Sequence, residues 1–145
     1  MKTKWVGLLL LALCGFLVVL YFGMPAPGVL NHTYTGVIAN IREVNGDLSV
    51  NNLELGPEEA QAVLKAIQNH TYATLFPNGT VIAYPPAQDV VLFLIDQADG
   101  QDAHTMVTVS SAGVITIDGK TYMLFPKNER KQKQLFQTLY DIIPK

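Results

Sequence analysis

Three aspartates spaced three residues apart are the first candidate for chemistry in this chain. Asp96, Asp99 and Asp102 stand in the segment Asp-Gln-Ala-Asp-Gly-Gln-Asp. Clustered carboxylates supply the hard oxygen ligands that Ca²⁺ prefers, but an EF-hand loop places its acids at positions 1, 3 and 5 and a glutamate at 12. We therefore interpret the segment as a hairpin tip, keep the three aspartates as a minor metal candidate, and expect no cofactor.

The residue types of nucleophilic catalysis are present, but they lack a catalytic spacing. His32, His70 and His104 are scattered over the chain, without a HExxH pair or a zinc-ligand spacing. Ser110 and Ser111 lack the G-x-S-x-G and S-x-x-K frames. A triad assembled by folding stays open, because triads are recognised by geometry. We expect a protein that is not an enzyme. We also expect His70 to lie at a helix C-terminus, where the helix dipole favours an imidazolium.

Four cations lie close together near the C-terminus. Lys127, Arg130, Lys131 and Lys133 are opposed only by Glu129 within residues 127–133. The ordinary interpretation of such a run is a solvated helix face. Cations at the start of a helix are slightly unfavourable, and this misfit keeps open a contact with an anionic surface, such as lipid headgroups or cell-wall polymers. Self-association through the acidic remainder of the chain is a further alternative.

The charge of the chain is divided unevenly. Residues 31–119 carry two basic and ten acidic side chains, whereas residues 120–145 carry six basic and two acidic ones. The net charge of −4 over these 115 residues argues against a nucleic-acid partner, which requires a basic footprint.

The N-terminal segment is the most apolar part of the chain. Residues 5–24 form a run of 20 without a charge. As a helix this run would be about 30 Å long, which matches the hydrocarbon core of a bilayer. A cleaved signal peptide is the alternative, but its apolar core is normally only about 7 to 15 residues long. We therefore expect an uncleaved signal-anchor that takes the lipid bilayer as a partner.

The flanking charges predict an orientation. Lys2 and Lys4 precede the apolar run, and no Lys or Arg follows it until Arg42. The positive-inside rule then places a tail of residues 1–4 in the cytosol and the remainder outside. The expected localisation is the cell membrane, single-pass, with an extracytoplasmic C-terminal domain.

Proline and glycine divide the rest of the chain into a tether and one domain. Pro25, Pro27 and Gly28 interrupt the helix and predict a short tether over residues 25–32. Residues 33–145 are enough for one domain. Asx-Gly dipeptides predict chain reversals, at residues 45–46, 78–79, 99–100 and 118–119.

Hydrophobic periodicity between these turns predicts eight strands and two helices. The strands are expected at residues 33–44, 47–51, 72–76, 80–84, 90–95, 105–110, 114–117 and 120–125. The helices are expected at residues 57–70 and 128–143. The predicted fold is α+β: one N-terminal transmembrane helix, followed by a small extracytoplasmic domain in which two helices pack on a largely antiparallel sheet.

In its general plan the chain resembles small uncharacterised membrane-anchored proteins of Gram-positive bacteria. The features shared are the Lys-led anchor, the Pro-Gly tether, an outer domain without cysteine, and the hairpin Asp118-Gly119-Lys120-Thr121-Tyr122. The resemblance carries over no functional residue. Our leading hypothesis is a membrane-tethered binding or accessory domain that meets an envelope protein or an anionic polymer. The alternatives are a hydrolase with a site assembled across loops, and an immunity or inhibitor-type envelope protein.

Overall fold

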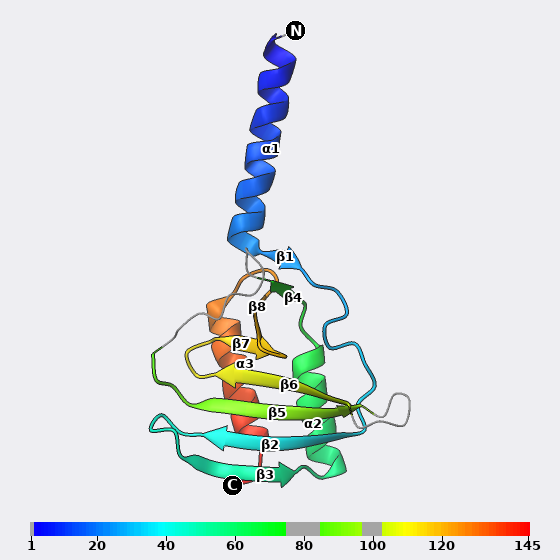
Figure 1. The fold of residues 1–145 in the computed structure, drawn as a ribbon, viewed down its shortest axis with the longest axis vertical. Coiled ribbons are helices and arrows are strands. Elements are labelled where there is room, and N and C mark those ends of the chain that lie inside the picture. Colours follow the sequence, from blue (N-terminus) through cyan, green and yellow to red (C-terminus); the bar gives the residue numbers. More distant parts are fainter. Residues whose placement is uncertain (1, 75–84, 97–102) are drawn as a thin grey trace.

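The computed structural model describes residues 2–74, 85–96 and 103–145, and in the first helix it describes the side chains of residues 4–19 (Figure 1). These residues form an α+β structure with three helices and one antiparallel sheet. The helices are α1 (Lys2–Phe22), α2 (Pro57–Gln68) and α3 (Glu129–Ile142). The strands are β1 (Met24–Pro25), β2 (Gly36–Arg42), β3 (Leu48–Glu54), β4 (Tyr72–Thr74), β5 (Asp89–Asp96), β6 (Ala103–Ser110), β7 (Ile115–Ile117) and β8 (Lys120–Leu124).

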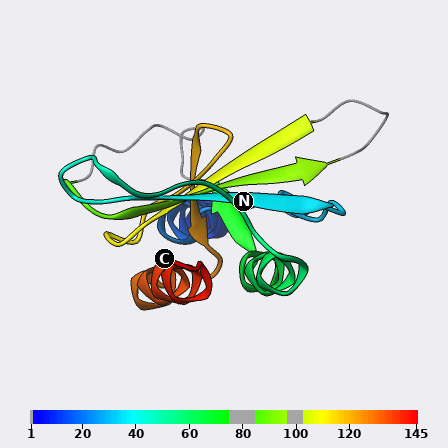
Figure 2. The ribbon, with the colours of Figure 1, turned by 90° about the horizontal axis from the view of Figure 1, so that it is seen from below.

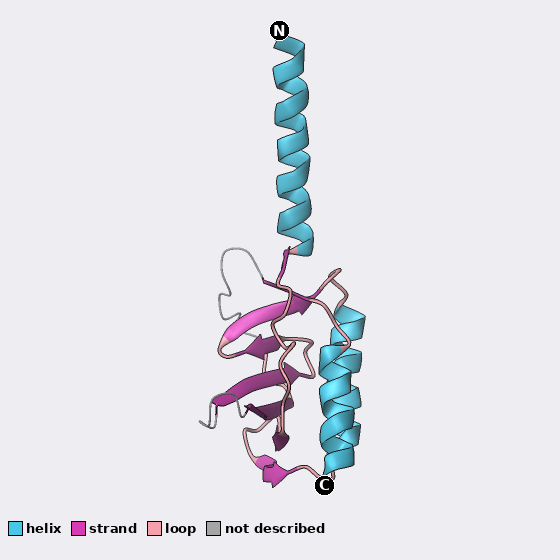
Figure 3. Ribbon diagram, turned by 90° about the vertical axis from the view of Figure 1, so that its right-hand side faces the viewer, coloured by secondary structure: helices cyan, strands magenta, loops and turns pink. Residues whose placement is uncertain are grey.

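The sheet is a single layer covered on one face. Its strand order is β1-β4-β8-β7-β6-β5-β2-β3, and every pair of neighbours is antiparallel. α2 and α3 lie side by side against the same face, as the view from below shows (Figure 2). From the side, all the strands lie on one side of these two helices (Figure 3).

The core lies between that face and the two helices. Alternate residues of the central strands point toward the helices, so Val37, Leu92 and Val107 are fully buried in neighbouring strands. Val63 and Ile67 of α2 meet them at the i, i+4 spacing of a helical stripe. The sequence determines which side of α2 and of α3 faces the sheet, because each of these two helices has only one apolar side.

Turn chemistry fixes the hairpins as the sequence predicts. Asp118 and Gly119 have φ angles of 48° and 77°, and they join Ile117 to its partner Lys120 through a two-residue loop. Asn45 and Gly46 join β2 to β3, with Gly46 at φ 91°. The predicted strand at residues 80–84, the turn at residues 78–79 and the turn at residues 99–100 lie outside the described residues.

The segment expected as a tether belongs to the domain. Met24 and Pro25 pair with β4, and the amide of Ala26 donates to the carbonyl of Tyr72 at 2.8 Å. Leu30 is buried in the core at 2 % exposure. A two-residue pairing adjacent to prolines leaves too little periodicity for sequence reasoning to detect it.

The prediction of a single-pass transmembrane anchor over residues 5–24 is contradicted. In the described part of the chain, no helix combines the length and the apolar character required to cross a membrane. The same finding overturns three related predictions. These are the transmembrane helix of the predicted fold, the uncleaved signal-anchor, and the membrane localisation with its orientation. α1 extends away from the domain (Figure 1), and none of its described side chains belongs to the core.

Candidate functional site

Only one of the three aspartates of the acidic segment, Asp96, lies among the described residues. Asp96 lies at the end of β5 and is partly buried. Asp99 and Asp102 lie outside the described residues. Among the residues that are described, no group of three or more His, Cys, Asp or Glu side chains is placed to hold a metal ion.

Ser110 is placed as a structural residue rather than a nucleophile. It ends β6 and is fully buried, so a substrate cannot reach its hydroxyl. The Oγ accepts a hydrogen bond from the amide of Ala112 at 3.1 Å. His104 precedes it by six residues on the same strand, which separates the two by about 20 Å. The structure does not bring this serine and this histidine together.

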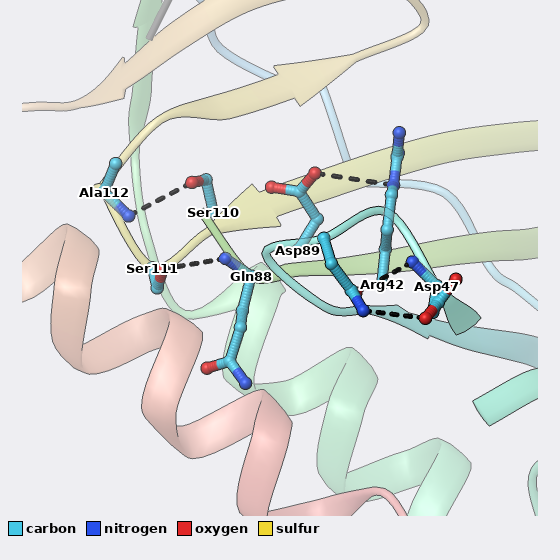
Figure 4. Close-up of polar contacts among 8 residues, drawn as sticks. Arg42, Asp47, Gln88, Asp89, Ser110, Ser111 and Ala112 are labelled. Carbon is cyan, nitrogen blue, oxygen red and sulfur yellow. Dashed lines mark hydrogen bonds and ion pairs between the residues drawn. The ribbon is translucent and has the colours of Figure 1, made fainter. Parts of the chain in front are cut away.

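A polar cluster instead supports the turn that follows β6 (Figure 4). Asp89 lies opposite Ser110 in the sheet, and its Oδ2 is 3.6 Å from the Nε of Arg42. Gln88 and Ser111 form two hydrogen bonds. The backbone amide of Gln88 donates to the Ser111 Oγ at 3.1 Å, and the backbone amide of Ser111 donates to the Gln88 carbonyl at 2.8 Å. These contacts fix the turn at residues 111–113 relative to β2 and β5.

Gln132 joins this turn to α3. It is 7 % exposed although it lies near the start of a mostly polar helix. Its Nε2 donates to the carbonyl of Gly113 at 2.5 Å, and its Oε1 accepts from the amide of Leu124 at 3.2 Å. This residue was not predicted from the sequence, because one glutamine among Lys, Gln and Arg has no pattern that marks it as buried.

The basic residues surround the beginning of α3. Asn128 caps the helix, and its Oδ1 accepts from the amide of Lys131 at 2.9 Å. All four predicted cations are exposed. The Nζ of Lys127 is 3.9 Å from the Oε1 of Glu129, and with side chains 42 % and 75 % exposed this pair neutralises little of the positive charge.

Three of the four cations lie together, and the fourth faces away from them. Lys127 and Lys133 line a pocket of about 260 Å³ with Gly113 and Gln132. Arg130 lies with Lys133 on the exposed outer side of α3, beside Gln134 and Gln137. Lys131 faces α2. The structure therefore brings Lys127, Arg130 and Lys133 to one exposed region, the basic face of α3, and separates Lys131 from it.

Lys131 lines a second pocket with His70. This pocket of about 330 Å³ lies between the end of α2 and the start of α3. Burial of the imidazole is the main cause that lowers the pKa of His70 below 6.5, and the charge of Lys131 lowers it further. The expectation that the helix dipole favours an imidazolium here is therefore wrong, because desolvation and a like charge outweigh it.

The lowered pKa of His70 predicts a loss of stability in acid. Between the folded pKa and 6.5 the unfolded chain binds more protons, so the free energy of unfolding falls as the pH drops through that window. A His70→Gln variant should lose less of its thermal midpoint than the wild type between about pH 7.5 and pH 5. Equal losses in the two proteins would contradict this assignment.

Comparisons with protein-family models, with curated proteins and with solved structures found no match for this chain.

Proposed function

We propose that this protein is a non-enzymatic binding domain whose basic face of α3, formed by Lys127, Arg130 and Lys133, contacts an anionic polymer. The observation that carries the proposal is the exposure of these three side chains in one region, opposed only by Glu129 among residues 127–133. The repeated phosphate or carboxylate groups of such a polymer match cations that are spread from Lys127, which precedes the helix cap Asn128, to Lys133 in α3.

The remainder of the chain supports this choice of partner. Residues 31–119 carry ten acidic and two basic side chains, so a polyanion is repelled elsewhere and directed to this one region. The contact needs no conformational change, because Gln132 and the turn at residues 111–113 already hold the start of α3 in place. A fixed surface lowers the entropic cost of binding.

Charge reversal tests the proposal. The affinity of the full chain for a fluorescent polyphosphate is measured by anisotropy at low and at high salt. Arg130→Glu combined with Lys133→Glu should weaken binding about tenfold or more at low salt, and the wild-type affinity should fall as salt rises.

The matched control reverses the same number of charges elsewhere. Lys65 in α2 and Lys120 in β8 are also exposed. Lys65→Glu combined with Lys120→Glu should change the affinity less than about threefold. Equal loss in the two double variants, or no binding by the wild type, would refute the basic face of α3 as the contact.

A further inference from the structure

We propose that the pocket between the end of α2 and the start of α3 binds one oxyanion, a phosphate or carboxylate group, between His70 and Lys131, and binds it most tightly when the imidazole is protonated. This inference rests on the proposed function, because it assigns a pH-sensitive subsite beside the basic face of α3. It uses the one cation of the run, Lys131, that faces away from that surface.

The lining of the pocket is suited to an oxyanion. Lys131 supplies a fixed positive charge, and His70 supplies a second one on protonation. Asn69, Gln134 and Thr138 add amide and hydroxyl groups that donate hydrogen bonds to oxygen. No Asp or Glu lies among the described residues that line this pocket. At about 330 Å³ its volume exceeds that of a single phosphate group.

Protonation of His70 beside Lys131 is unfavourable when no anion lies between the two side chains. His70 is partly buried, and Lys131 opposes its protonation from α3. From β4 the group on the other side of His70 is Tyr72, whose hydroxyl donates to the Ile67 carbonyl at 2.6 Å and whose pKa is raised by burial. That tyrosine stays neutral, so the charge that disfavours protonation of the His70 imidazole is that of Lys131.

A bound oxyanion reverses this balance. Its negative charge offsets the repulsion between the imidazolium and the ammonium, so the protonated form binds better than the neutral form. Linkage is reciprocal: an anion that prefers the protonated pocket must raise the pKa of His70 by the corresponding amount. Acidification through the titration of His70 then strengthens the hold on an anionic polymer at this end of α3.

The test follows the imidazole signals of the full chain by NMR titration, in about 50 mM sodium sulfate and in sodium chloride of equal ionic strength. Sulfate should raise the pKa of His70 by about half a unit relative to chloride, equivalent to about threefold tighter binding by the protonated form. His104, exposed on β6, is the internal reference and should not respond.

Variants separate the pocket from general screening. Lys131→Gln should raise the pKa of His70 in chloride and abolish the sulfate-dependent difference, whereas Lys120→Gln should preserve that difference. An equal response of His70 and His104, or no sulfate effect on His70, would overturn the pocket. If charge reversal weakens polyphosphate binding as expected but sulfate leaves the pKa of His70 unchanged, the proposed function stands without this subsite. If charge reversal has no specific effect but sulfate raises the pKa of His70, the polymer contact is refuted and the pocket stands.

Discussion

Replacing Gln132 by alanine should lower the free energy of unfolding by about 2 to 4 kcal/mol. Its side chain satisfies the amide of Leu124 and the carbonyl of Gly113, and it is 7 % exposed, so water cannot replace either bond without opening the site. Each buried backbone group left unpaired costs about 1 to 3 kcal/mol. Urea denaturation monitored by circular dichroism measures the difference.

The same helix offers a matched control. Gln137 is exposed and donates from its Nε2 to Asp141 at 2.8 Å. Gln137→Ala should change the stability by about 0.5 kcal/mol or less, since a solvated i, i+4 pair contributes little. If Gln132→Ala and Gln137→Ala behaved alike, Gln132 would not be the residue that joins α3 to the turn.

A comparable loss is expected when the core contact of α3 is truncated. Leu139 is fully buried and has no solvent-accessible surface. Leu139→Ala should cost about 2 to 5 kcal/mol, from the lost transfer free energy and from the cavity that remains. The thermal midpoint should fall accordingly in a calorimetric scan.

An exposed leucine provides the comparison for this variant. Leu48 at the start of the edge strand β3 is 51 % exposed. Leu48→Ala should cost less than about 1 kcal/mol, because it removes little buried area. A small effect at both positions would mean that neither α3 nor its basic face depends on the core for its position.

The elements that sequence reasoning found are those with local signals. Asp118-Gly119 specifies its hairpin because both residues adopt positive φ, and Pro57 with Glu58 marks the beginning of α2. Strand β5 is detectable as an apolar run, since it lies in the interior of the sheet beside β2 and β6. In each case the residues that determine the structure are adjacent in the chain.

The features that sequence reasoning missed depend on partners far apart in the chain. Pairing of β1 with β4 brings Met24 to Thr74, fifty residues away. The burial of Gln132 depends on Gly113, and the lowered pKa of His70 depends on its burial and on Lys131. The candidate site was therefore predictable only as a list of cations; which of them face outward and which faces α2 is decided by packing.

The basic face of α3 can be tested residue by residue through amide mapping by ¹H–¹⁵N NMR, while polyphosphate is added to the full chain. We expect the largest shift changes on residues 127–133 and on the neighbouring turn at residues 111–113. Changes centred on the acidic β2–β3 turn or spread evenly over the sheet would refute this contact, as would the absence of any change.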